Sequence, residues 1–275
     1  MKSPRIRAAS ECVVCGSPVR FASTTWHKNP DRFCYIHECS MCGFVHVLKN
    51  DWDYVEEGFT ESSSVGPRVG QENHFGREFH MASMAVDILD RGELDVLILG
   101  SGRSVDWRHI SELPQVASVT TSDLENFNGS KSFVALDERG ERTFDIVVAC
   151  EVVEHFVKPR EYMADLCNDV NDTGLAVLST NIYDGSDLSR HWYPFIPGHV
   201  AYYTPDAMIY LADENDMYVD FRMPKVSVEM AGTRKRYVLM SRNEAVIDHA
   251  GDYFAKHSFA PSEDRSAPDL GPVAR

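Results

Sequence analysis

Four groups of residues in this sequence combine chemically useful side chains with a telling spacing. In the first, from Asp95 to Asp123, the apolar run 96–99 meets a Gly-Ser-Gly turn at 100–102, and a second β-prone run ends on Asp123. In doubly wound α/β folds, this order offers backbone amides and a carboxylate to a nucleotide-like cofactor. Asp123 would accept hydrogen bonds from ribose hydroxyls; an ordinary loop carboxylate or helix cap is the alternative. The residues assigned to cofactor binding by this pattern are Gly100, Ser101, Gly102 and Asp123.

A second group, Glu151-Val-Val-Glu-His155, directly follows the apolar run 143–150. Ligands of open α/β sheets bind beyond the carboxyl ends of the strands, so these side chains are expected at the site. We assign Glu151 to the cofactor and Glu154 to the substrate. His155 can act as a base near neutral pH. A helix cap or a structural role is the alternative for His155.

The third group is the aromatic segment 191–205, which is long enough to cover a cleft above the sheet. His199 is a candidate acceptor ligand or base. Trp192, Tyr202 and Tyr203 are candidates for an apolar substrate wall with polar tips. The alternative is that these rings pack the segment against the sheet, and Thr204 followed by Pro205 also has the form of a helix start.

The fourth group consists of two Cys-x-x-Cys-Gly knuckles, with 23 residues between Cys15 and Cys39. Each knuckle lets two thiolates reach one tetrahedral ion, and two knuckles complete a closed four-thiolate site. Such a site has no open position for catalysis, so the expected metal is structural Zn²⁺ in a ribbon of two to four strands. Four reduced cysteines without metal are the alternative. The expected ligands are Cys12, Cys15, Cys39 and Cys42.

The elements that must hold these groups alternate between strand and helix. An amphipathic helix is predicted over 72–91, with Phe75, Phe79, Ala82, Val86 and Leu89 as its apolar stripe. Strands are predicted over 96–99, 116–121, 132–136, 143–150 and 175–180, with a helix over 107–113 and another from Pro159. Two further strands, 218–221 and 235–241, are expected to form an antiparallel edge hairpin. This alternation predicts a mostly parallel sheet with helices on both faces.

Composition limits the classes of partner. The chain has 275 residues, of which 43% are hydrophobic, and its net charge is −15. This charge disfavours nucleic acid as a partner. The sequence contains no apolar run of 18 residues, which argues against a membrane span, and the odd, clustered set of seven cysteines is unlike a secreted disulfide framework. We therefore expect a cytoplasmic protein.

These pieces together resemble class I S-adenosylmethionine-dependent methyltransferases, in particular the small-molecule branch that carries Glu-His after the fourth strand. The resemblance covers roughly residues 75–242 and rests on the order and spacing of the runs 96–102, 144–156, 174–181 and 198–205. It implies a Rossmann-like seven-stranded sheet, S-adenosylmethionine as cofactor and a small-molecule methyl acceptor. An N-terminal zinc ribbon on such a domain looks like enzymes that methylate sugars or other metabolites.

Two positions depart from the family pattern. Ile98 stands where the family usually has an acid before the glycine turn, and Ser104 stands where it has a third glycine. Either the cofactor binds more weakly or another group substitutes for the acid. The expected activity is methyl transfer to an O, N or C atom of a metabolite such as a sugar or natural-product intermediate. The alternatives are an RNA methyltransferase that grips nucleic acid with its ribbon, and an inactive cofactor-binding scaffold.

The expected domain organisation follows from these assignments. Residues 1–50 form the zinc ribbon, 51–71 a linker or lid, and 72–245 the methyltransferase domain. Residues 246–275 form a C-terminal extension whose tail is expected to be disordered. The sequence does not predict an oligomeric state.

Overall fold

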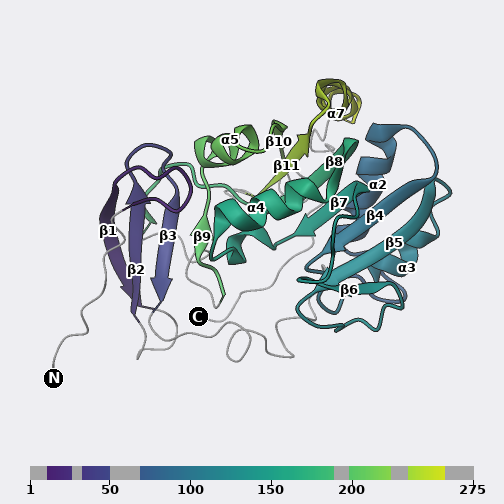
Figure 1. Ribbon diagram of the computed structural model, residues 1–275, viewed down its shortest axis with the longest axis horizontal. Helices are drawn as coiled ribbons and strands as arrows, with labels where there is room; N and C mark the ends of the chain where they lie inside the picture. The colour runs from purple at the N-terminus through teal and green to yellow at the C-terminus, as the bar shows by residue number, and fades with distance from the viewer. Residues whose placement is uncertain (1–10, 27–32, 50–68, 189–197, 224–234, 258–275) are drawn as a thin grey trace, which may run out of the picture.

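The computed structural model describes residues 11–26, 33–49, 69–188, 198–223 and 235–257. These residues form two β-sheets, a small one at the N-terminal end and a larger one that lies among the helices of the rest of the chain (Figure 1). The expected tail beyond Phe259 and most of the expected linker lie outside the described residues.

The larger sheet has seven strands in the order β10-β11-β8-β7-β4-β5-β6. The five strands from β8 to β6 run parallel, whereas β11 is antiparallel to both of its neighbours. The predicted doubly wound, mostly parallel sheet and its antiparallel edge hairpin are therefore confirmed. The strands are β4 (Leu94–Leu99), β5 (Val116–Asp123), β6 (Phe133–Ala135), β7 (Phe144–Cys150), β8 (Val170–Asn181), β10 (Tyr218–Arg222) and β11 (Lys235–Ser241).

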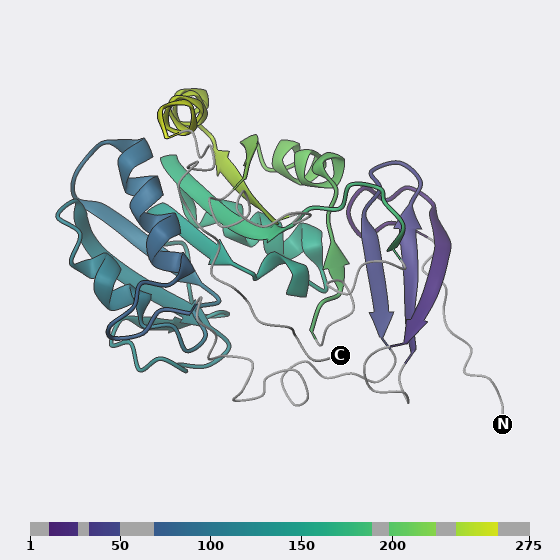
Figure 2. The ribbon, with the colours of Figure 1, turned by 180° about the vertical axis from the view of Figure 1, so that it is seen from behind.

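Helices cover both faces of this sheet because successive side chains of a strand point to opposite sides. In β4, Leu97 and Leu99 pack toward α4 (Pro159–Asn168) and α5 (Pro205–Asp213). Val96 and Ile98 pack toward α2 (Arg77–Leu89), α3 (Asp106–Ser111) and α7 (Glu244–Lys256). Figures 1 and 2, taken from opposite sides, show α4 in front of one face and α2 in front of the other. The strands are almost fully buried, which explains their continuous apolar runs.

The N-terminal sheet is antiparallel and consists of β1 (Val19–Trp26), β2 (Phe33–Cys39), β3 (Val45–Lys49) and β9 (Ala201–Tyr202). Only three of these strands belong to the N-terminal segment. The fourth strand, β9, comes from the segment that follows β8, and it pairs Val45 with Tyr202 and His46 with Ala201. The small sheet is therefore completed by residues from the larger part of the chain.

Helix α2 differs from its prediction in extent and in its buried face. It begins after Gly76 and not at residue 72, and Phe75 before it is exposed. Its buried side chains include Met81, Met84 and Ile88, which the predicted stripe omitted. The predicted stripe is incomplete because α2 packs between the sheet and two other helices, so apolar residues surround most of its circumference.

Helix α7 has no counterpart among the predicted elements. Asn243 accepts a hydrogen bond from the amide of Ala245 at 3.1 Å and caps the helix, and Val246 and Ala250 are buried one turn apart. These signals were available in the sequence. Helical structure thus continues past residue 245, where we expected the methyltransferase domain to end.

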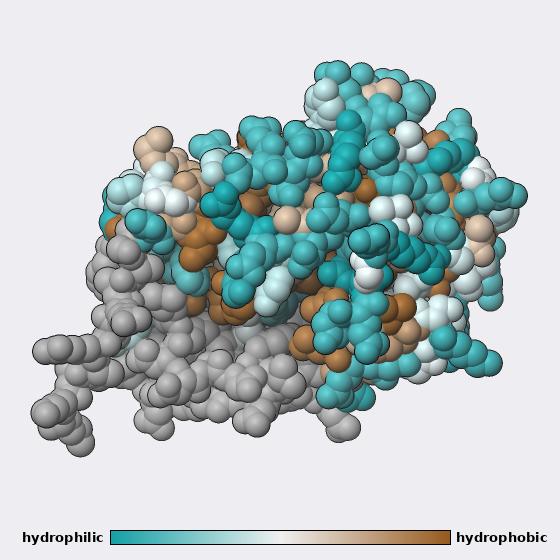
Figure 3. Space-filling model, in the orientation of Figure 1, coloured by the Kyte–Doolittle hydropathy of each residue, from teal (hydrophilic) through white to brown (hydrophobic). Residues whose placement is uncertain are grey.

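The described surface is mostly hydrophilic on the face shown in Figure 3, with apolar residues in smaller areas between. Its exposed large apolar side chains lie on several separate elements, as is normal for a folded domain. They are Met41, Phe75, Leu124, Val157, Ile209, Tyr218 and Met223. Within the described ranges, none of the helices has both the length and the apolar character needed to cross a bilayer.

Candidate active site and metal centre

The glycine turn that follows β4 is held tightly at the carboxyl edge of the sheet. Gly100 donates its amide to the carbonyl of Ser122 at 2.8 Å and has a φ of 67°. A Cβ built on Gly100 would lie 2.5 Å from a methyl carbon of Val152. Gly102, with a φ of 51°, has no atom within 4 Å of such a Cβ. The turn therefore needs glycine at 100 for lack of space, and its backbone is open at 102.

Asp123 lies beside this turn, as the sequence pattern predicts. One oxygen of its carboxylate accepts the amide of Gly102 at 2.8 Å, and the other accepts the amide of Leu124 at 2.6 Å. Burial raises the pKa of Asp123, and the two amide hydrogen bonds partly offset the rise. Ser101 is buried next to them and accepts a hydrogen bond from the Asn128 amide at 3.0 Å. The four residues of the turn pattern that were assigned to the cofactor are thus in one place.

Ser104, one of the two departures from the family pattern, contacts a carboxyl group from α2. Ile98 is buried on the face of the sheet that α2 covers. The hydroxyl of Ser104 donates to the buried carboxyl of Glu78 at 2.5 Å. Burial, reinforced by the neighbouring Asp106 and partly offset by the Ser104 hydrogen bond, raises the pKa of Glu78 to about 8. Asp106 accepts the amide of Gly76 at 2.8 Å. A carboxyl group is therefore beside the turn, supplied by a helix and not by β4.

Glu151 follows β7 in a left-handed conformation, with a φ of 59°. This conformation is strained for any residue other than glycine, and residues strained in this way occur preferentially at functional sites. Ser179 donates its hydroxyl to the Glu151 carboxylate at 2.7 Å, Lys235 donates its ammonium, and Arg77 lies 3.6 Å away. Burial opposes ionisation, but the two cations outweigh it and lower the pKa of Glu151. Glu151 is thus an ionised group at the carboxyl edge of the sheet.

Glu154, His155 and His199 come together from two separate segments. Glu154 and His155 belong to the short 3-10 helix η2 (Val153–His155), which follows β7, whereas His199 precedes β9. The rings of His155 and His199 meet edge to face with centroids 4.9 Å apart, and Nε2 of His199 lies 4.0 Å from a Glu154 oxygen. Glu154 and His199 are buried, while His155 is half-buried.

Two of the aromatic residues assigned to the substrate, Tyr202 and Tyr203, are buried and do not form an exposed wall. Tyr202 is 1% exposed and packs with Ile36 and Tyr183 in the core of the small sheet. Tyr203 is fully buried, and its hydroxyl donates to the carbonyl of Val153 at 3.0 Å. Both rings therefore pack the segment, and their contact with a substrate stays a prediction. Trp192 lies outside the described residues.

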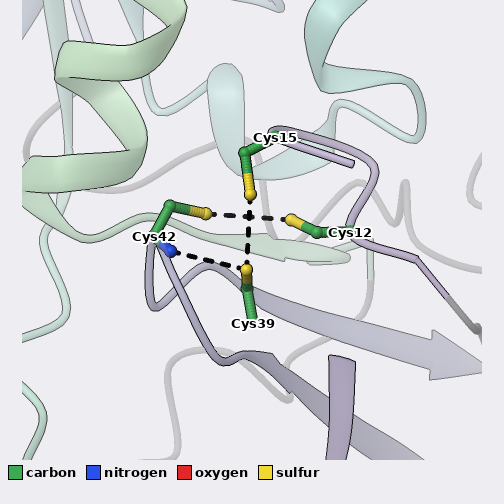
Figure 4. Close-up of side chains that lie close together, drawn as sticks. All are labelled: Cys12, Cys15, Cys39 and Cys42. Carbon is green, nitrogen blue, oxygen red and sulfur yellow. Dashed lines mark hydrogen bonds between the residues drawn. The ribbon is translucent and has the colours of Figure 1, made fainter. Parts of the chain in front are cut away.

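The four cysteines of the two knuckles point toward one centre (Figure 4). The Sγ atoms of Cys12 and Cys42 are 3.8 Å apart, and those of Cys15 and Cys39 are 3.4 Å apart. Four thiolates at about 2.3 Å from a tetrahedral Zn²⁺ are about 3.8 Å from one another, so the spacing suits this ion. The amides of Val14, Met41 and Cys42 point at the sulfur atoms at 3.4 Å. Hydrogen bonds of this kind orient metal ligands and tune their affinity for the ion.

Sequence reasoning missed three side chains of the carboxyl edge, namely Arg77, Glu78 and Lys235. Glu78 lies one turn before the buried residues Met81 and Ala82, so a charged residue on an apolar helix face was the available signal. Lys235 had no local signal, because it comes from the antiparallel strand β11 and reaches Glu151 across the sheet.

The sheet order, the glycine turn with its acid and the Glu-His strand end together define a class I methyltransferase fold. A family model described as a methyltransferase domain matches residues 71–220. The chain belongs to this family, and it is an S-adenosylmethionine-dependent methyltransferase. The resemblance read from the sequence is thereby confirmed.

Solved structures with a similar fold include three methyltransferases of low identity. One is the 1,6-didemethyltoxoflavin-N1-methyltransferase of Burkholderia thailandensis, with 1,6-didemethyltoxoflavin and S-adenosylhomocysteine bound. It is 14% identical, the match covers 80% of this chain and 98% of that chain, and the TM-score is 0.49. An S-adenosylmethionine-dependent methyltransferase of Clostridium acetobutylicum is 11% identical, and the match covers 60% of this chain and 92% of that chain with a TM-score of 0.46. A TehB-like S-adenosylmethionine-dependent methyltransferase of Corynebacterium glutamicum is 13% identical, and the match covers 61% of this chain and 90% of that chain with a TM-score of 0.44. The search of curated proteins found no significant match.

Proposed function

We propose that this protein binds S-adenosylmethionine at the turn formed by Gly100, Ser101 and Gly102 and transfers its methyl group to a small metabolite. The observation that carries the proposal is the placement of Asp123 beside the open backbone of Gly102, with a hydrogen bond of 2.8 Å between them. Glycine lets a ligand approach the backbone, and the free lone pairs of the Asp123 carboxylate suit ribose hydroxyls. The residues present therefore fit the cofactor.

Methyl transfer requires in-line placement of the acceptor, exclusion of water and removal of a proton from many acceptors. When bound, S-adenosylmethionine supplies an electrophilic methyl group. Glu151 lies at the same edge of the sheet and is a candidate for holding the cofactor's charged end. Glu154, His155 and His199 are the polar cluster that would face the acceptor, and base catalysis by either histidine stays a prediction of the sequence.

A small metabolite suits the charge of the molecule better than nucleic acid does. The net charge of −15 opposes binding to a polyanion, and the cluster at η2 is built from one carboxyl group and two imidazoles. We propose an O, N or C atom of a sugar or natural-product intermediate as the acceptor, and an RNA acceptor or an inactive scaffold as the alternatives.

Titration calorimetry of the zinc-loaded protein with S-adenosylhomocysteine tests the cofactor site. We expect one site per chain and expect Asp123→Ala to weaken binding by about 1–3 kcal/mol, because a charge-assisted ribose contact is lost. Asp172→Ala is the matched control, since Asp172 is an exposed carboxylate in the irregular stretch of β8 between Val170 and Leu175, alongside the first residues of β7 and so at the amino edge of the sheet. Absence of binding to the wild-type protein, or equal loss in both variants, would overturn the proposed site.

A mass spectrum of candidate acceptors after incubation with the protein and cofactor identifies the substrate class. A mass gain of one methyl group on a metabolite supports the proposed activity. A gain on RNA alone supports the first alternative, and cofactor binding without turnover over a broad acceptor panel supports the scaffold.

A further inference from the structure

The cluster of Glu154, His155 and His199 has the geometry of a metal site. Each of the three residues offers one ligand atom, and these atoms all lie within 4.8 Å of one another. For three such atoms a point exists within about 2.8 Å of each, whereas metal-bound imidazole nitrogen and carboxylate oxygen lie at about 2.0–2.2 Å. Small rotations of the three side chains would shorten the ligand-to-centre distances from about 2.8 Å to the range of metal–ligand bonds. Burial of Glu154 and His199 reduces competition from water.

Backbone contacts fix the two segments that carry these side chains. Val200 donates its amide to the carbonyl of Glu154 at 2.9 Å, and the Tyr203 hydroxyl donates to the carbonyl of Val153. The carbonyl of Val200 in turn accepts the amide of Val47 from β3 at 2.9 Å. Each residue adjacent to a ligand is thus held by the rest of the fold. Preorganised ligands of this kind are what a specific metal site needs.

We propose that Glu154, His155 and His199 bind a divalent first-row transition cation, such as Mn²⁺, Fe²⁺, Co²⁺ or Zn²⁺. Two imidazoles with one carboxylate favour such ions over Mg²⁺ and Ca²⁺, which prefer oxygen ligands. Three protein ligands leave coordination positions open, in contrast to the closed set of four cysteines. The site is therefore suited to hold an oxygen atom of a second molecule.

The position of this site connects it to methyl transfer. Val152, the residue before η2, contacts Gly100 of the cofactor turn, so η2 lies next to the proposed cofactor site. If the proposed function holds, the open positions face the acceptor, and the acceptor class narrows to molecules that bind a cation through oxygen. The two histidines then serve as neutral ligands and not as bases. Cation binding itself does not depend on the proposed function.

Electron paramagnetic resonance of Mn²⁺ tests the site without the cofactor or an acceptor. The protein is loaded with one equivalent of Zn²⁺ per chain, which the four thiolates take in preference to the three-ligand site, and Mn²⁺ competes poorly for thiolates. The cysteine site therefore stays occupied, and the three-ligand site stays open, while Mn²⁺ is titrated. The signal of free Mn²⁺ falls as the ion binds, and we expect one Mn²⁺ per chain. His199→Ala and Glu154→Gln should each weaken Mn²⁺ binding at least about tenfold. His155→Gln, at the half-buried position, provides a variant with little risk to folding.

The matched control is His249→Ala, which removes an exposed histidine on α7 far along the chain from the cluster. Its Mn²⁺ affinity should equal that of the wild type, and zinc content and circular dichroism should show that all variants are folded. Wild-type protein that binds no Mn²⁺, or folded His155→Gln that binds it as tightly as the wild type, overturns the proposal. Because calorimetry with S-adenosylhomocysteine is independent of this measurement, failure of the metal site leaves the proposed function intact.

Discussion

Gly100 shows how a single position limits the cofactor turn. Its φ of 67° lies in the left-handed region, and an added Cβ would collide with Val152. We expect Gly100→Ala to destabilise the protein by at least about 1–2 kcal/mol from backbone strain alone, with the collision in addition. Urea unfolding measures the loss, and calorimetry with S-adenosylhomocysteine measures the accompanying loss of affinity.

The double variant Gly100→Ala with Val152→Ala separates the two causes. Removing the Val152 methyl groups should recover the part due to the collision and leave the part due to φ. Equal stability of Gly100→Ala and the wild type would show that the turn is not as constrained as its geometry indicates.

Glu78 gives the protein a specific dependence on pH. Its folded pKa of about 8 lies above the usual value of 4.5, so the folded state retains a proton that the unfolded state releases between these two values. The unfolding free energy therefore decreases as pH rises through this range, by up to about 1.4 kcal/mol per pH unit, and levels off above pH 8.

Glu78→Gln tests this linkage because glutamine resembles the protonated acid and does not titrate. Urea unfolding at pH 6, 7 and 8 should show the variant gaining stability relative to the wild type as pH rises. Parallel stability curves for the two proteins would contradict the raised pKa. Ser104→Ala offers a comparison, since it removes the hydrogen bond that partly offsets the rise.

At the scale of elements, β9 joins the small sheet to the candidate active site. Its neighbour Val200 is bonded on one side to β3 and on the other to Glu154. Thr204 continues this link, because its hydroxyl caps α5 and also donates to the carbonyl of Cys42. Within the described residues, the end of the aromatic segment, 200–204, therefore contacts the ribbon.

If the four cysteines bind Zn²⁺, as their spacing predicts, removal of the ion should loosen this link. Without the metal the knuckles lose their main source of order, and the pairing of β3 with Val200 loses its support. We expect chelation to speed hydrogen exchange at the amides of Val47 and Val200 by at least about tenfold, which corresponds to about 1.4 kcal/mol. The amide of Val147 in the central strand β7 is the internal control. Unchanged protection at Val47 would show that the ribbon holds its pairing without metal.

At the scale of the whole molecule, the ribbon shares an apolar cluster with one face of the methyltransferase fold. Phe44 is 1% exposed and packs against Tyr203 with ring centroids 5.2 Å apart. Val14, inside the first knuckle, belongs to the same cluster as Met208 of α5 and Leu97 of β4. Two units with a common core should unfold together.

Phe44→Ala should therefore destabilise the large sheet as well as the ribbon. The expected loss is about 3–5 kcal/mol in the unfolding free energy, measured by circular dichroism, which reports mainly on the larger part of the chain. Met41→Ala is the control, because Met41 is 72% exposed in the same knuckle and should change stability little. A loss confined to the ribbon would show that the two parts unfold independently.

Features of the fold and of the candidate site could be predicted from the sequence where the residues that form them are close together in the chain. Strand β4, the glycine turn and Asp123 are encoded by residues within one short stretch, and the structure places them as expected. The predicted stripe of α2 was incomplete because burial from several sides leaves no single apolar face to detect. The carboxyl group of Glu78 beside Ser104 was not predicted, since the two residues are 26 positions apart.

The sequence by itself determined the class of fold, the cysteine knuckles and the strand ends that carry polar residues, because buried strands and tight turns impose composition on neighbouring positions. Only the tertiary structure decided that His199 meets Glu154 and His155, that β9 completes the ribbon sheet and that Lys235 reaches Glu151. These contacts join residues from distant parts of the chain. Their partners are selected by the packing of the whole molecule, which leaves no periodic pattern in either segment.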